Sequence, residues 1–127
     1  KPILKNGLAI VDINSDGSFP EEPIKVLLRD KFCRLENINI VDDTAVIADT
    51  INNTVTLYDV ASDPYLENPV QSISENMALP HGAKLSPDKK LLVVTNFGLN
   101  VKHQVIHWRS WASPRKDRII VYELQGN

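Results

Sequence analysis

Two stretches of the chain, residues 35–60 and 80–124, repeat the same order of short strands and turns. Each stretch reads as a strand, a turn with aspartate, an apolar strand that ends at Asp or Asn, a connection, and a last strand with Tyr-Asp or Tyr-Glu. The two turn aspartates, Asp43 and Asp88, are 45 residues apart. Repeats of this length are typical of stacked sheets, because one such sheet cannot bury both of its faces alone.

The segments between the turns have the composition of β-strands. Turn residues (Asn, Asp, Gly, Pro and Ser) separate them, and no segment has a convincing amphipathic helical pattern. The expected strands are short and rich in Val, Ile, Thr and Tyr: 8–13, 44–50, 54–60, 90–96 and 118–124. We therefore predict an all-β fold of antiparallel, four-stranded sheets.

The stretch SPDKKLLVVTNFG, residues 86–98, resembles the signature of YVTN-type β-propellers, which are relatives of the lactonase-like seven-bladed propellers. The stretch ADTINNTVTLYDV, residues 48–60, looks like the same pair of strands in another blade, with a similarity to NHL repeats. The resemblance covers about residues 7–127. Lys89 departs from the family pattern, which usually has glycine at this place in the turn.

The resemblance implies blades of a β-propeller that is incomplete in this chain. It implies the outer half of one blade at 7–33, a full blade at 34–78, and a blade without its last strand at 79–127. Propellers close with about four to eight blades, so we expect the remaining blades or another copy of the chain to complete the ring. The alternative is a small antiparallel sheet protein unrelated to propellers.

Four polar residues are expected at one end of these sheets. In a four-stranded meander the first strand begins at the end where the second strand finishes. Glu36 and His81 accompany the starts of first strands, and Asp49 and Asn96 finish second strands. Because the first strand of a blade is innermost, Glu36 and His81 would approach the central channel. We therefore expect Asp49 and Asn96 to bind a ligand together with His81 and Glu36. The alternative for each of the four residues is a structural role, in a turn or in a contact between blades.

The connection that follows Asn96 is much longer than its counterpart. Residues 50–53 make this connection in the first copy, whereas residues 97–117 make it in the second. Long loops in compact domains are often functional, and aromatic residues with arginine suit an interface. The ligand-binding candidates in this loop are His107, Trp108, Arg109 and Trp111. The alternative is a loop that packs its tryptophans on its own blade.

Composition excludes several classes of protein. The net charge of −2 argues against a nucleic-acid binder, and no apolar run reaches the roughly 20 residues that span a membrane. The single cysteine, Cys33, excludes an internal disulfide. Charge is uneven, however: residues 1–60 carry 6 Lys/Arg and 10 Asp/Glu, and residues 61–127 carry 8 and 6.

The sequence thus favours a propeller scaffold that binds a small molecule or a protein partner on the face with His81 and loop 97–117. The alternative that the resemblance implies is a lactonase-like hydrolase with its active site at the propeller axis. There His81 and Glu36 would be the catalytic residues. We expect no cofactor; calcium is the cation that the oxygens of Asp49, Asn96 and Glu36 would suit.

Overall fold

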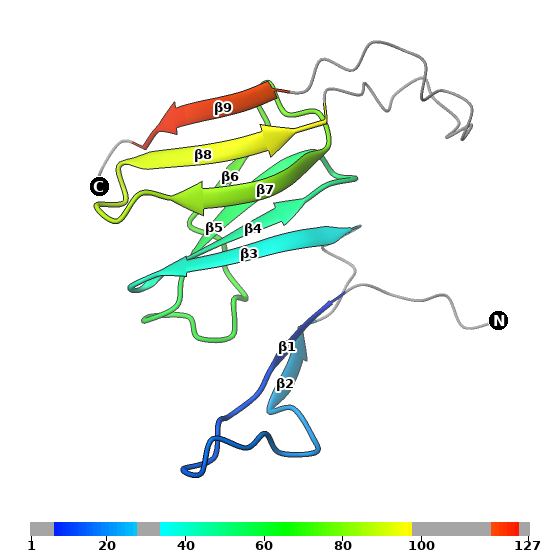
Figure 1. Ribbon diagram of the computed structural model, residues 1–127, viewed down its shortest axis with the longest axis vertical. Helices are drawn as coiled ribbons and strands as arrows, with labels where there is room; N and C mark the ends of the chain where they lie inside the picture. The colour runs from blue at the N-terminus through cyan, green and yellow to red at the C-terminus, as the bar shows by residue number, and fades with distance from the viewer. Residues whose placement is uncertain (1–6, 28–33, 98–117, 125–127) are drawn as a thin grey trace, which may run out of the picture.

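The computed structural model describes residues 7–27, 34–97 and 118–124 of the 127-residue chain. Within these residues the chain is all-β and contains no helix, and its sheets are antiparallel with two, four and three strands, as Figure 1 shows. The fold class predicted from the strand pattern is confirmed at this level. All five expected strands are present, each one to three residues shorter than expected.

The strands follow chain order within every sheet. The two-stranded sheet contains β1 (Leu8–Ile10) and β2 (Lys25–Leu27). The four-stranded sheet contains β3 (Leu35–Val41), β4 (Thr44–Asp49), β5 (Thr54–Asp59) and β6 (Gln71–Ile73). The three-stranded sheet contains β7 (Pro80–Leu85), β8 (Leu91–Asn96) and β9 (Arg118–Glu123). We call them the β1–β2, β3–β6 and β7–β9 sheets.

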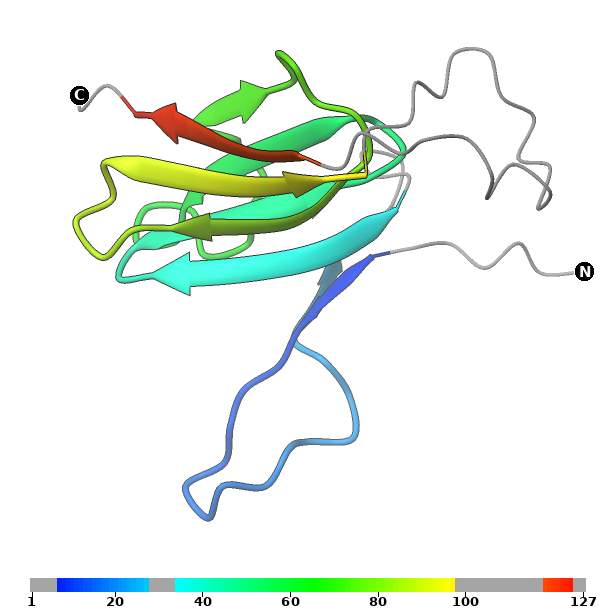
Figure 2. The same ribbon diagram turned by 45° about the horizontal axis from the view of Figure 1, so that its top comes forward.

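The β3–β6 sheet lies between the other two, as both views show (Figures 1 and 2). Its strand β4 is buried at every position from Ala45 to Asp49, which explains the unbroken apolar run Ala45–Ala48. Strand β8, in contrast, alternates between exposed and buried residues. Strand β4 of the middle sheet is therefore covered on both faces, and strand β8 of the β7–β9 sheet on one.

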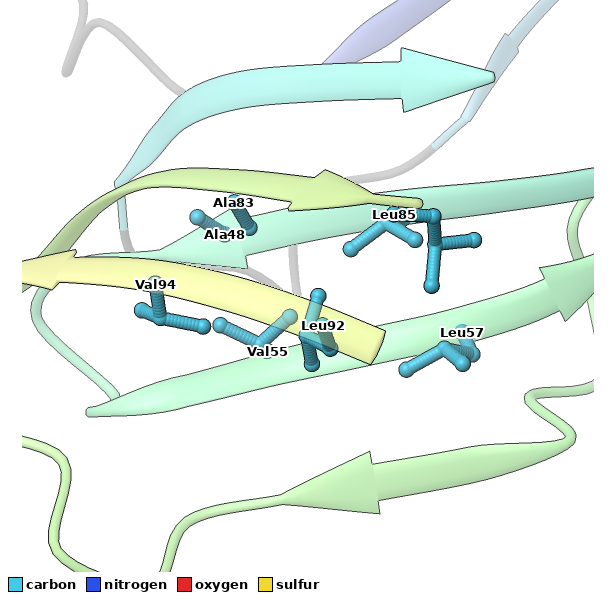
Figure 3. Packing of buried hydrophobic residues seen from close by; sticks show 8 residues of the cluster. Ala48, Val55, Leu57, Ala83, Leu85, Leu92 and Val94 are labelled. Atoms are coloured by element: carbon cyan, nitrogen blue, oxygen red, sulfur yellow. The ribbon is translucent and has the colours of Figure 1, made fainter. Parts of the chain in front are cut away.

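The main core fills the space between the β3–β6 and β7–β9 sheets (Figure 3). Side chains from the two inner faces interdigitate in such a core, and here strands β4 and β7 each combine an alanine with a branched side chain. The middle sheet contributes Val46, Ala48, Val55 and Leu57, and the β7–β9 sheet contributes Ala83, Leu85, Leu92 and Val94.

A second core cluster covers the opposite face of the middle sheet. Ala45, Ile47, Tyr58 and Leu66 are buried there. Leu8 and Ile10 of β1 pack against this cluster, together with Leu35 and Val60. The short β1–β2 sheet therefore attaches to the middle sheet through one side of β1.

The two larger sheets pair their strands in the same register. Asp49 lies opposite Thr54, and Asn96 lies opposite Arg118 at the corresponding position. The first pair of strands in each sheet is also interrupted by an irregularity at the same place, at Glu36 in one sheet and at His81 in the other. The repeat seen in the sequence is thus a repeat of strand pairing.

Side chains of the middle sheet bind the backbone of the next sheet. The Oδ1 atoms of Asn37 and Asn39 on β3 accept hydrogen bonds from the backbone N–H groups of Ala83 (3.2 Å) and Leu85 (3.1 Å) on β7. β7 is an edge strand, so these bonds satisfy donors that would otherwise invite another strand. The hydroxyl of Thr50 adds a buried bond, 2.6 Å long, to the carbonyl oxygen of Pro80.

Candidate functional site

The starts of β3, β7 and β9 and the ends of β4 and β8 meet at one end of the molecule, on the right in Figure 1. Pairing places Asp49 opposite Leu35, next to Glu36, and Asn96 opposite Pro80, next to His81. The structure thus brings the four polar residues to the same end of their sheets. They differ in burial: His81 is half exposed there, whereas Asp49 and Asn96 are buried.

His81 and Glu36 are in contact across the two sheets. His81 Nε2 lies 3.5 Å from Glu36 Oε2, and the other carboxylate oxygen pairs with Arg34 Nε. The His81 side chain is 50% exposed, whereas that of Glu36 is only 18% exposed. The ring of Phe97 packs edge-on against His81, with centroids 4.9 Å apart. His81 is therefore oriented on two sides and still open to solvent.

Asp49 is buried and binds the local backbone. Its Oδ1 accepts a hydrogen bond of 2.9 Å from the N–H of Arg34, just before β3. Its Oδ2 accepts one of 2.8 Å from the side-chain amide of Asn52. These contacts hold the start of β3 and the turn after β4, and they favour the structural alternative for Asp49 over the ligand-binding one.

Asn96 occupies the matching position in the next sheet and is also buried. Its Oδ1 accepts a hydrogen bond of 3.1 Å from the N–H of Ala78, just before β7. Its buried amide nitrogen Nδ2, however, has no hydrogen-bond partner among the described residues. An unpaired buried donor costs about 1–3 kcal/mol, so this position differs from that of Asp49, where both carboxylate oxygens have partners.

A shallow hollow of about 420 Å³ opens beside these residues. Phe97 and Ile119 supply its apolar walls. Polar groups converge from the ends of three strands: the residues that complete the lining are His81, Thr95, Asn96 and Arg118. No carboxylate is among these lining residues, and the nearby carboxylate of Glu36 pairs with Arg34 and His81. The hollow therefore presents hydrogen-bond donors and a guanidinium group beside apolar walls.

Sequence reasoning missed Thr95, Arg118 and Ile119 as residues of this hollow. The signal was present, because alignment of the two copies sets residue 118 against residue 54, whose partner is Asp49. That match places Arg118 beside Asn96. The loop candidates His107, Trp108, Arg109 and Trp111 lie outside the described residues, between the lining residues Phe97 and Arg118.

The structure shows no candidate metal centre in the part of the chain that it describes: no group of three or more His, Cys, Asp or Glu side chains could hold an ion there. Of the oxygens that suggested calcium, those of Asp49 and Glu36 have protein partners, and calcium binding stays a prediction. In the same ranges, no helix is long and apolar enough to cross a membrane.

Comparisons with family models, with curated proteins and with solved structures found no match to this chain.

Proposed function

We propose that this chain is part of a β-propeller scaffold that binds a ligand at the hollow beside His81. Two sheets that share one register stack face to face through a common apolar core, which supports blades of such a scaffold. The observation that carries the ligand site is the convergence of Arg118, His81 and a buried asparagine on one open hollow.

The lining favours a small ligand with an apolar body and a negatively charged group. A volume of about 420 Å³ lies within the range of small-molecule sites. The Arg118 guanidinium suits a carboxylate, because its N–H groups can donate two parallel hydrogen bonds. Phe97 and Ile119 would contact the apolar part, and the hydroxyl of Thr95 supplies a further polar contact. Residues 97–117 connect two of these lining residues in the sequence.

The experiment compares two probes of the same shape, benzoate and the neutral benzamide, in a titration followed by amide NMR shifts. We expect benzoate to bind more tightly, with shifts at Thr95, Phe97 and Ile119. Arg118→Gln should remove the preference for benzoate, and Lys84→Gln, which removes a charge on another exposed strand position, should keep it. Equal binding of both probes, or shifts elsewhere only, would refute the site.

The second candidate function is the hydrolysis of a lactone or ester, and the contact between His81 and Glu36 favours it. A carboxylate that holds a histidine next to an open hollow is an arrangement suited to a general base, which takes a proton from the attacking water. Arg118 would stabilise the negative charge that develops on the carbonyl oxygen. In this function the acid/base residue is His81, with Glu36 as the residue that orients it.

Turnover of a simple aromatic lactone such as dihydrocoumarin tests this candidate. We expect His81→Gln to abolish turnover, and Glu36→Gln to reduce it and alter its pH profile. Binding of the lactone without any hydrolysis by the wild-type chain would leave the binding scaffold as the better proposal.

A further inference from the structure

We infer that the outer side of the β7–β9 sheet is an interface, and that a second copy of this chain covers it head to tail. The side chains on this side are apolar but exposed. Ile119 is 72% and Val121 57% exposed, and Leu91 and Val93 lie on the same side of β8. This side adjoins the hollow, which shares Ile119 with it, but the inference rests on the apolar side chains and does not depend on ligand binding.

The equivalent positions in the middle sheet show how these side chains pack when another sheet covers them. The shared register makes Val121 the counterpart of Leu57, Ile119 that of Val55, and Val93 that of Val46. In the middle sheet these counterparts are almost fully buried under the β7–β9 sheet, at 6%, 0% and 0% exposure. Within the residues that the structure describes, no sheet covers the outer side of the β7–β9 sheet, so it is the same surface left exposed.

The surface that would cover it also remains bare in this chain, at the opposite end of the stack. The same register makes Ile38 and Ile40 of β3 the counterparts of Ala83 and Leu85, which bury themselves in the main core. Ile38 and Ile40 are 44% and 56% exposed on the side that faces away from the β7–β9 sheet. Val26 of β2 is exposed on that side of the stack as well.

Charge favours contact between opposite ends over contact between like ends. Four acidic residues and no Lys or Arg lie in residues 8–24, next to the bare end of the stack: Asp12, Asp16, Glu21 and Glu22. The outer side of the β7–β9 sheet carries exposed Lys84 and Glu123, which balance in charge, whereas Arg118 lies on the other side of β9, opposite Asn96. Contact between two acidic ends would therefore bring like charges together, and contact of an acidic end with this side would not. A contact between two unlike surfaces is heterologous, so it builds rings when the rotation closes and open chains when it does not.

The test uses three lysine variants at positions of nearly equal exposure. Val121→Lys blocks the outer side of the β7–β9 sheet, and Ile40→Lys blocks the opposite end of the stack. Val70→Lys, at a position 58% exposed and outside both surfaces, is the control. Association is measured by sedimentation over a range of protein concentrations, with circular dichroism to check folding, and Ile119→Lys replaces Val121→Lys if that variant does not fold.

We expect the wild-type chain and Val70→Lys to associate, and each blocking variant to raise the dissociation constant by about tenfold or more. An equimolar mixture of the two blocking variants should form a heterodimer and nothing larger, because each retains the surface that the other lacks. Three results would overturn the inference: a monomeric wild-type chain at every concentration, association that only Val121→Lys removes, or no heterodimer in the mixture. The second of these would indicate two β7–β9 sheets packed against each other.

Discussion

Lys89 combines an unfavourable backbone conformation with a favourable side-chain contact. Its φ is 58°, in the region where glycine is preferred, as expected from the turn that usually carries glycine. Its ammonium group lies 2.6 Å from Asp43 Oδ1 on the adjacent sheet. A change to glycine therefore relieves the backbone and removes the ion pair at once.

We predict that Lys89→Gly raises the melting temperature by a few degrees in an Asp43→Asn background, where the ion pair is already absent. In the wild-type background the gain should be smaller, since the contact is lost as well. Thermal unfolding of the four variants measures both effects. A lower melting temperature in both backgrounds would show that the positive φ carries no strain that glycine relieves.

The same contact gives a pH dependence of known sign. The hydrogen bond from Lys89 holds the pKa of the Asp43 carboxyl below its ordinary value of 3.8, with a smaller contribution from Thr44. A lowered pKa in the folded state stabilises the protein above pH 3.8, and this stabilisation is lost as the pH falls through the lowered value. Wild type should thus exceed Asp43→Asn in stability near neutral pH, and the difference should shrink below about pH 4. Urea unfolding at several pH values measures it; a difference that stays constant down to pH 2 would contradict the coupling.

Replacing His81 should affect ligand binding more than it affects the stability of the fold. The residue is half exposed and its bond partner is a side chain, not the backbone of the next sheet. The contact with Glu36 is long, at 3.5 Å, and lies at the surface on the His81 side, so we expect His81→Gln to cost only about 0–1 kcal/mol in unfolding by urea. The same variant should weaken the binding of benzoate severalfold, because it alters one wall of the hollow. A large loss of stability with unchanged binding would make His81 a structural contact between sheets.

At the scale of single residues, the sequence indicated where polar groups gather but not what they bind. The strand-end positions of Asp49 and Asn96 follow from the repeat. Their burial does not, because it depends on the backbone N–H groups of Arg34 and Ala78 that happen to lie within reach. Arg118 was overlooked because an arginine at the first position of a strand has no pattern of its own, and only the alignment of the two copies places it beside Asn96.

Among the elements, strand β3 binds the next sheet through side chains that are unusual in a strand. Asparagine is disfavoured within strands, yet β3 contains Asn37 and Asn39 on the side facing β7. The reason is that their amide oxygens bind the N–H groups of an edge strand. The composition of strands and turns predicted that strands β3 and β7 exist. It did not predict the hydrogen bonds between them, because these depend on how the two sheets stack.

We predict that Asn39→Ala destabilises the fold by about 1–3 kcal/mol, because the N–H of Leu85 loses its acceptor in a partly buried place. Asn68→Ala, in an exposed loop, is the control and should stay within about 0.5 kcal/mol of wild type. Urea unfolding compares the two. Equal, small effects would mean that water replaces Asn39 without cost, and that β7 does not depend on this bond.

For the whole molecule, the repeat in the sequence predicted stacked antiparallel sheets. It did not predict how unevenly they are covered. Strands β4 and β5 of the middle sheet are covered on both faces, whereas the β7–β9 sheet is covered on one. Among the described residues, the β1–β2 sheet contacts the core through Leu8 and Ile10. A sequence pattern reveals that a strand is covered on both faces only where its apolar run is unbroken, as in β4.

This unevenness predicts the order in which the sheets open. Local opening is easiest where few apolar contacts are lost, and two three-residue strands form a marginal sheet by themselves. Amide hydrogens of β1 and β2 should therefore exchange fastest among the strands, and those of β4 and β5, whose residues Val46, Ala48 and Val55 are fully buried, should exchange slowest. Hydrogen exchange followed by NMR on the Val121→Lys variant measures this without interference from association. Equal protection of β1 and β4 would mean that all sheets open as one unit, and that β1 is held by more than the contacts of Leu8 and Ile10.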